Sequence, residues 1–286
     1  MSHITQPAGG APASSQTPTL FSAQRVRIQH IERAKAEGIP LTMLTAYDAL
    51  TAPILEAAGV DMLLVGDSLG NVILGHSSTL PVTLEDMERA TAAVARSTSR
   101  AMIVADLPFG TYEDTAEHAF ASATRLMKAG AHAVKLEGGQ SRAHIIAGLV
   151  SAGIPVCAHL GYTPQSENTL GGPRMQGRGA GADALRRDAE AVQKAGAFAV
   201  VFEMVPASIA TELTQSLSIP TIGIGAGPNT DGQVLVWSDM AGYSDWTPSF
   251  VRKFGQLGPA LREAASDYVK AVRERSFPGP DNYKND

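Results

Sequence analysis

The fold of this chain is decided by one sequence pattern that occurs twice. Residues 128–137 read Lys-Ala-Gly-Ala-His-Ala-Val-Lys-Leu-Glu, and residues 194–203 read Lys-Ala-Gly-Ala-Phe-Ala-Val-Val-Phe-Glu. In each stretch a predicted helix ends at a glycine, which adopts the left-handed cap conformation easily, and an apolar run follows at once. The repeat of this turn indicates an architecture in which helices and strands alternate.

Outward from these two stretches, apolar runs of strand length recur from Ile39 onward. The runs are continuous rather than alternating, as expected of parallel strands covered on both faces. The segments between them are typical of amphipathic helices, with Thr83, Thr115 and Asp183 as candidate N-caps. The predicted strands are Leu41–Thr45, Met62–Val65, Met102–Ala105, Ala133–Leu136, Val156–His159, Ala199–Phe202, Thr221–Ile224 and Val234–Val236.

Eight strands that alternate with helices predict the α/β class and a single-domain (β/α)8 TIM barrel. The rival is an open doubly wound sheet. No Gly-x-Gly-x-x-Gly lies in the first βα turn, so nothing supports the dinucleotide-binding form of that rival. Within the 286 residues we expect a flexible tail over 1–22, the catalytic barrel over 23–276 and a C-terminal tail over 277–286.

The composition excludes several classes of function. The formal net charge of −5 disfavours a nucleic-acid partner. The single cysteine, Cys157, excludes an internal disulfide framework and fits a reducing compartment. No apolar stretch is long enough to cross a bilayer, and the first twenty residues lack a secretory signal pattern. We therefore expect a cytoplasmic protein that acts on small molecules and has no membrane partner.

Polar residues gather where the predicted strands end, which is where barrels of this type carry their chemistry. No single one of these residues indicates a particular function, but their shared position at strand ends predicts one common site. They are Asp67, Ser68, Asp106, Lys135, Glu137, His159 and Glu203.

Asp67, Asp106 and Glu137 form an all-oxygen set that suits Mg²⁺, a cation that keeps several waters for a substrate to displace. Zinc would require Cys and His at ligand spacing, and the sequence lacks that spacing. The alternative role for Asp67 and Asp106 is to cap the following helix or loop.

Lys135 is two positions from Glu137, so both side chains point to the same face of a strand. The lysine either forms a structural ion pair or offsets the charge of a bound carboxylate. Glu203 ends an apolar strand, which makes it a candidate proton carrier. The alternative is an acid paired with Lys135 or Arg174.

His159 follows Cys157 by two positions, and both can face the barrel interior. A lone strand histidine is more often a core group than a catalyst. Cys157 is not expected to be a nucleophile, because no partner is indicated and single buried cysteines are usually inert. Two long segments after strands, residues 66–82 and 160–182, are candidate functional loops. The second is rich in glycine and carries Arg174, as expected of a lid over an anionic ligand, and the alternative is a disordered surface loop.

Taken together, the motifs resemble those of the ketopantoate hydroxymethyltransferase (3-methyl-2-oxobutanoate hydroxymethyltransferase) family. They occur in that family's order and spread from about Leu41 to Tyr243. The segments that carry the resemblance are residues 44–48 (Leu-Thr-Ala-Tyr-Asp), 65–70 (Val-Gly-Asp-Ser-Leu-Gly), 75–83, 105–109 (Ala-Asp-Leu-Pro-Phe), 134–139 (Val-Lys-Leu-Glu-Gly-Gly), 159–165 (His-Leu-Gly-Tyr-Thr-Pro-Gln), 176–179, 203–206 (Glu-Met-Val-Pro) and 222–227.

The resemblance implies a Mg²⁺-dependent enzyme of pantothenate biosynthesis that transfers a hydroxymethyl group from 5,10-methylenetetrahydrofolate to 3-methyl-2-oxobutanoate and gives 2-dehydropantoate. It implies a homo-oligomer, typically a decamer, and leaves the folate-binding residues unassigned. By matching motifs it assigns Asp67, Asp106 and Glu137 to the metal, Asp67, Ser68, Asp106, Lys135 and His159 to the keto acid, and Glu203 to the general base.

Two other readings stay open at this point. One is a Mg²⁺-dependent 2-oxo-acid lyase or phosphonomutase, which would share the barrel and its acids. The other is a non-catalytic barrel that binds a phosphorylated ligand through Gly223–Gly227, and it would leave the strand-end acids without a role.

Overall fold

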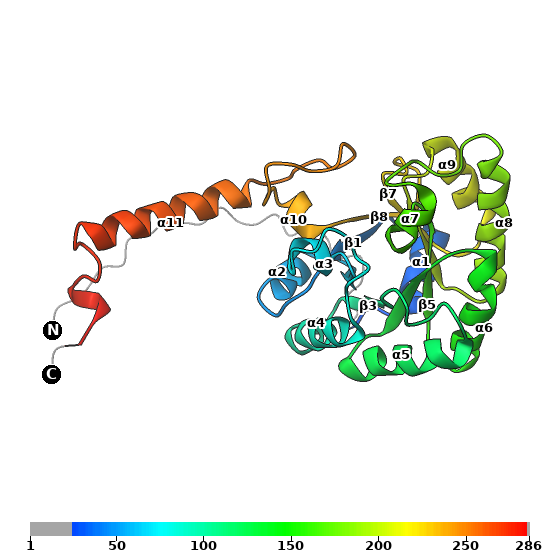
Figure 1. The fold of residues 1–286 in the computed structure, drawn as a ribbon, viewed down its shortest axis with the longest axis horizontal. Coiled ribbons are helices and arrows are strands. Elements are labelled where there is room, and N and C mark those ends of the chain that lie inside the picture. The colour runs from blue at the N-terminus through cyan, green and yellow to red at the C-terminus, as the bar shows by residue number, and fades with distance from the viewer. Residues whose placement is uncertain (1–24, 285–286) are drawn as a thin grey trace.

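The computed structural model describes residues 25–284, so the tail predicted for residues 1–22 lies outside the described residues. Eight parallel strands close into a barrel in chain order, and the first strand pairs with the last. Helices surround this barrel (Figure 1). The architecture confirms the predicted single-domain (β/α)8 barrel.

The elements alternate along the chain as the sequence predicts. The strands are β1 (Leu41–Thr45), β2 (Met62–Val65), β3 (Met102–Asp106), β4 (Ala133–Glu137), β5 (Val156–Gly161), β6 (Ala199–Glu203), β7 (Thr221–Ile224) and β8 (Gly232–Leu235). The helices are α1 (Ile28–Glu37), α2 (Ala52–Ala57), α3 (Leu69–Val72), α4 (Leu84–Ser97), α5 (Ala116–Ala129), α6 (Ala143–Ser151), α7 (Glu167–Leu170), α8 (Gly181–Lys194), α9 (Ala207–Ser216), α10 (Trp237–Met240) and α11 (Leu257–Arg273).

Strand boundaries differ from the prediction mainly at the carboxyl ends. The strands β3, β4 and β6 each run one residue further than the apolar run and end on Asp106, Glu137 and Glu203. These acids are therefore held by the barrel's own hydrogen bonds rather than by loops. The prediction for the eighth strand was wrong by two residues at its start, because Gly232 already pairs with Leu41 of β1.

Two of the three predicted helix caps are correct. The side chains of Thr83 and Thr115 accept hydrogen bonds from the third backbone amide of α4 and α5, respectively. Asp183 is not a cap, because α8 begins two residues earlier at Gly181. Asp183 lies in the first turn instead, and its carboxylate is 2.7 Å from Nη1 of Arg186.

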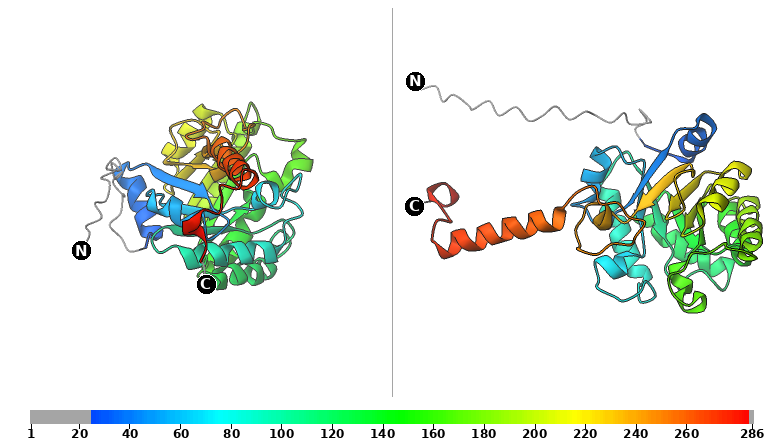
Figure 2. Two further views of the ribbon diagram at one scale, coloured as in Figure 1. Left: turned by 90° about the vertical axis from the view of Figure 1, so that its left-hand side faces the viewer. Right: turned by 90° about the horizontal axis from the view of Figure 1, so that it is seen from above.

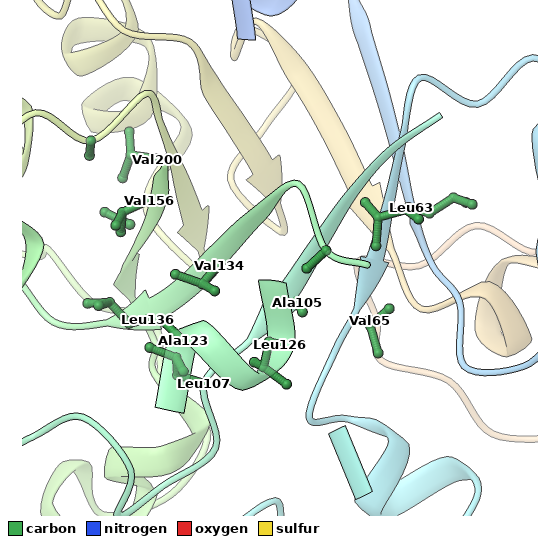
Figure 3. Packing of buried hydrophobic residues seen from close by; sticks show 14 of the residues in the cluster. Leu63, Val65, Ala105, Leu107, Ala123, Leu126, Val134, Leu136, Val156 and Val200 are labelled. Carbon is green, nitrogen blue, oxygen red and sulfur yellow. The ribbon is translucent and has the colours of Figure 1, made fainter. Parts of the chain in front are cut away.

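The strands separate two apolar layers. Alternate side chains, such as Met62, Leu64 and Val104, fill the barrel interior, where Ile31 of α1 joins them. The other side chains face the surrounding helices, and Figure 3 shows this outer layer with Val134 between strand and helix. With both faces covered, the barrel holds its strand ends rigidly.

Helix α11 does not pack on the barrel. The predicted barrel range 23–276 includes this helix, yet none of its residues is buried. It extends away from the barrel (Figures 1 and 2), and apolar side chains such as Leu261, Tyr268 and Val272 are more than 40% exposed. The predicted C-terminal tail, described as far as Lys284, follows it and includes a 3₁₀ turn at Pro280–Asn282.

Candidate active site

The carboxyl ends of the strands surround a cavity of about 590 Å³. All the candidate site residues named from the sequence line this one cavity, although they come from five different strands or the loops after them. They are Asp67, Ser68, Asp106, Lys135, Glu137, His159 and Glu203.

Strand register places the charged groups beside one another. Asp106 of β3 is the neighbour of Lys135 of β4, and Glu137 of β4 is the neighbour of His159 of β5. Since neighbours in a parallel sheet point to the same face, their side chains meet inside the barrel. Nζ of Lys135 lies 3.0 Å from Oδ1 of Asp106, and both side chains are at least 95% buried.

Asp67 is fixed to Asp106 by the turn after β2. Its backbone N–H donates to Oδ2 of Asp106 at 3.0 Å. Gly66 makes this turn possible, because a Cβ there would lie only 2.9 Å from Oγ of Ser68. The hydroxyl of Ser68 is in turn 2.8 Å from the hydroxyl of Tyr47, so Ser68 has a defined orientation at the cavity wall.

The buried carboxyl groups repel one another, and burial together with this repulsion shifts their pKa values. Burial, and then the charges of Asp106 and Glu137, raise the pKa of Asp67 to about 7. Burial also raises the pKa of Asp106, and the ammonium of Lys135 opposes this only in part. Burial would lower the pKa of Lys135, but Asp106, Glu137 and Asp67 outweigh it and raise that pKa, so Lys135 stays charged. Lys135 thus faces three buried carboxyl groups.

His159 lies between two carboxylates and beside Lys135, whose Nζ is 3.4 Å from Nδ1 of the imidazole. Its Nδ1 is 3.4 Å from Oε1 of Glu137, and its Nε2 is 3.3 Å from Oε2 of Glu203. Burial and Lys135 would lower the pKa of His159, but the two glutamates outweigh both and raise it to about 9. Glu203 therefore faces an imidazolium at the mouth rather than the apolar surroundings predicted for it, and neither Lys135 nor Arg174 is its partner.

A buried glutamine that the sequence argument did not assign connects the acids. Nε2 of Gln165 donates to Oδ2 of Asp67 and to the carbonyl of Leu107, both at 2.9 Å. Its backbone N–H donates to Oε2 of Glu137 at 3.0 Å. Its Oε1 accepts a hydrogen bond of 2.6 Å from the hydroxyl of Tyr112. Gln165 therefore orients two of the predicted metal ligands at once.

Sequence reasoning missed Gln165 because an amide does not titrate and so carries no charge signal. Its position in the segment His159–Gln165, directly after β5, was the only available clue. Tyr112 was missed because its contribution depends on a contact between the loop after β3 and the loop after β5.

The donor set fits a divalent cation. Asp67, Asp106 and Glu137 are all buried, and Oδ1 of Asp106 is paired with Nζ of Lys135 at 3.0 Å. A further cation beside Asp67 and Asp106 would relieve the repulsion between them. Within residues 25–284 no three carboxylate, imidazole or thiolate side chains are arranged so that all of them could hold one metal ion. Mg²⁺ is usually bound by one or two carboxylates, with waters or substrate as its other ligands.

The remaining sequence candidates have structural roles. Cys157 is buried, and burial raises the pKa of its thiol to about 12, so it is a poor nucleophile. The glycine segment after β7 is covered by protein: a Cβ on Gly225 would lie 3.0 Å from the ring of Phe250, and one on Gly227 would lie 2.5 Å from Ala207. This packing disfavours the phosphate-binding reading of Gly223–Gly227.

The predicted lid, residues 160–182, is only partly ordered by regular structure. It includes a 3₁₀ turn and α7, and Glu167 and Pro173 line the cavity. The backbone N–H of Gln176 donates to the carbonyl of Met204 at 2.9 Å, which ties this loop to the residue after Glu203. Met204 has a φ of 49°, a strained conformation for a residue with a side chain. A lid function for the loop stays a prediction.

The fold and the cavity define an enzyme of the (β/α)8-barrel class, with a buried acidic cluster at the carboxyl end of its strands. The family model for ketopantoate hydroxymethyltransferase matches residues 25–280. The chain belongs to this family.

Named relatives agree with this assignment. The chain is 56% identical over 261 residues to the 3-methyl-2-oxobutanoate hydroxymethyltransferase of Corynebacterium efficiens, a match that covers 91% of this chain and 97% of the relative. It is 52% identical over 270 residues to the protein of the same name from Leifsonia xyli subsp. xyli, with 94% and 98% covered.

Solved structures with the same fold are more distant. A phosphonopyruvate hydrolase solved with oxalate and Mg²⁺ has a TM-score of 0.60 at 14% identity, with 89% of this chain and 92% of the hydrolase covered. A 2,3-dimethylmalate lyase has a TM-score of 0.57 at 17% identity, with 90% and 91% covered. At these identities the likeness shows the barrel fold alone.

The contacts of Gln165 predict a stability effect. Gln165→Met keeps the side chain's approximate volume but removes its buried hydrogen bonds to Asp67, Leu107 and Tyr112. We expect a loss of roughly 1–3 kcal/mol in the free energy of unfolding, measured by urea denaturation. Gln176→Met is the control on the same loop, because this half-buried side chain donates only to the carbonyl of Arg174. Equal stability of the two variants would contradict the bridging role of Gln165.

Proposed function

We propose that this protein transfers a hydroxymethyl group from 5,10-methylenetetrahydrofolate to 3-methyl-2-oxobutanoate and gives 2-dehydropantoate. The observation that supports the proposal most is the row of charged groups at the strand ends, where Nζ of Lys135 lies 3.4 Å from Nδ1 of His159 and Nε2 of His159 lies 3.3 Å from Oε2 of Glu203. Proton removal from a keto acid requires a base, and a nearby cation can offset the negative charge that develops. The names of the relatives support the same reaction.

Asp67, Asp106 and Glu137 are proposed to hold Mg²⁺ together with the keto acid. When bound, the metal would supply Lewis acidity that makes the carbon next to the 2-oxo group more acidic. The mutual repulsion of the buried acids supports this role.

The side chains around the keto acid are proposed to have separate roles. The ammonium of Lys135 offsets the negative charge of the bound keto acid and of the enolate that it forms. The hydroxyl of Ser68, oriented by Tyr47, can donate to a substrate oxygen at the same wall. His159 is held between Glu137 and Glu203 and keeps the carboxylate of Glu203 directed into the cavity.

Glu203 is proposed to take the proton from C3 of 3-methyl-2-oxobutanoate. The electron pair left at C3 forms the new carbon–carbon bond to the methylene carbon that the folate delivers. One water is consumed overall, its oxygen becomes the new hydroxyl group, and tetrahydrofolate is released. Glu203 is the only acid at the end of β6, and it retains 17% side-chain exposure, so it can reach a ligand.

The second candidate function is a Mg²⁺-dependent lyase or phosphonomutase, because solved structures with such names share the barrel fold. Both reactions begin with an enolate, so the buried acids do not separate them. Dependence of product formation on the folate does, and we expect strict dependence.

The family and the structure also support proposals about location and oligomeric state. No helix in residues 25–284 is long and apolar enough to cross a membrane. A cytoplasmic location is our proposal from the family and from the single buried cysteine. A homo-oligomer is supported by apolar side chains that one chain leaves exposed: those on α11, and Leu50, Ile54 and Ile73 in or next to α2 and α3. A second copy of the chain can cover both.

The base assignment predicts the effect of Glu203→Gln, which keeps size and shape but cannot accept a proton. Exchange of the C3 hydrogen of 3-methyl-2-oxobutanoate in D₂O without folate, followed by NMR, should fall at least about 100-fold. Binding of the keto acid should change little. The control is Glu190→Gln on the exposed face of α8. Near-normal exchange by Glu203→Gln would remove this residue from the mechanism.

The oligomer proposal predicts that α11 holds subunits together. Leu261→Glu and Tyr268→Glu place charges on its exposed apolar face and should lower the sedimentation coefficient in analytical ultracentrifugation. Arg262→Glu, on the same helix, controls for the charge change. If the two apolar variants sediment as the wild type does, α11 is not the contact.

A further inference from the structure

The cavity has a second half that the proposed keto acid does not use. One wall carries the buried acids, Lys135 and His159, and it accounts for a small, charged substrate. The other part of the lining is Val234–Val236 of the β8 end, the loop residues Trp246, Pro248 and Phe250, and the hydroxyl-bearing residues Ser77–Thr79. A cavity of about 590 Å³ is of the size that accommodates a drug-sized ligand. A small keto acid leaves most of it open.

The segment after α10 is built to hold its aromatic residues over this open half. The amide of Phe254 donates to the carbonyl of Met240 at 2.8 Å, and Nζ of Lys253 donates to the carbonyls of Ser244 and Asp245 at 2.7 and 2.9 Å. Phe250 lies against Gly225, where a side chain would not fit. The loop is therefore fastened at both ends, and Phe250 is fixed at the β7 edge of the cavity.

Trp246 lines the same cavity although 77% of the residue is exposed. A large aromatic side chain at the rim of a cavity offers a flat stacking surface. A flat heteroaromatic ring can lie against it.

The lining of the same cavity includes an unpartnered hydroxyl. Thr79 is only 4% exposed and lines the cavity, and its Oγ1 makes no hydrogen bond with any described residue. A buried hydroxyl without a partner is costly unless a ligand or water satisfies it. Ser77 and Ser78, also at the cavity wall, add two further hydroxyls. These hydroxyls suit the polar edge of a ring rather than an aliphatic group.

We propose that the pterin ring of the folate co-substrate binds in this half of the cavity, with its face against Trp246 and Phe250 and its polar edge toward Thr79. The inference rests on the proposed function and adds a binding site to it. Glu203 lies in the same cavity, so the methylene carbon of a folate bound here would lie beside the carbon that Glu203 deprotonates.

Binding of tetrahydrofolate, which lacks the reactive methylene group, tests the site without turnover. The chain has two tryptophans, and Trp237 is buried and does not line the cavity. In a Trp237→Phe background, tetrahydrofolate should therefore quench the fluorescence of Trp246. By isothermal titration calorimetry, Trp246→Ala and Thr79→Val should each bind tetrahydrofolate about ten-fold more weakly.

Kinetics separate this inference from the function on which it rests. Trp246→Ala should raise the KM for 5,10-methylenetetrahydrofolate about ten-fold, while the KM for 3-methyl-2-oxobutanoate and the folate-independent C3 exchange stay near wild type. Phe254→Ala is the matched control, because this exposed aromatic is on the same segment but does not line the cavity. Thermal melts check the fold of every variant.

Two results would overturn the inference. If Trp246→Ala and Thr79→Val bind tetrahydrofolate as the wild type does, and turnover is normal, the pterin site is elsewhere and the proposed function stands. If the wild-type protein makes no product with the folate, the proposed function itself fails, and the pterin site fails with it.

Discussion

The ion pair between Lys135 and Asp106 is the interaction on which the rest of the site depends. Three carboxyl groups are buried at one barrel mouth, and Lys135 is the cation that lies directly against Asp106, 3.0 Å away. A buried charge without a partner is strongly destabilising, so the barrel tolerates this cluster only because the lysine and a network of hydrogen bonds compensate it. The compensation is incomplete, as the raised pKa of Asp67 shows. The site therefore has capacity for a further cation.

The closed barrel fixes the positions of these charged groups relative to one another. Register makes Asp106 and Lys135 neighbours, and likewise Glu137 and His159, so each charged group is positioned by two strands that cannot shift independently. Gln165 then joins the β2, β3 and β4 sides through four hydrogen bonds. One wall of the cavity is thereby rigid and charged. The lining at the β8 end and the loop that carries Trp246 is largely apolar, and this difference within one cavity is the basis for proposing two unlike substrates there.

The sequence predicted the barrel and the charged half of the site well, because both leave periodic or titratable signals. Continuous apolar runs located the strands, and acids directly after such runs are at the mouth of any closed parallel barrel. The start of α8 was misplaced because Asp183 fits the first turn of a helix as well as it fits a cap. The sequence of α11 does not indicate that this helix leaves the barrel. An amphipathic helix has the same pattern whether its apolar face packs on its own chain or on another. Gln165, Thr79 and Trp246 were beyond sequence reasoning because their roles arise from contacts between distant loops.

If the buried acids accept a divalent cation together with the keto acid, the two ligands must bind cooperatively. Isothermal titration of Mg²⁺ into the chelator-treated protein, with and without 3-methyl-2-oxobutanoate, measures this. We expect each ligand to tighten the binding of the other by the same factor in both orders of addition, and Asp106→Asn to abolish this mutual effect. Equal affinity for the keto acid with and without Mg²⁺ would show that the acids do not bind the two ligands together.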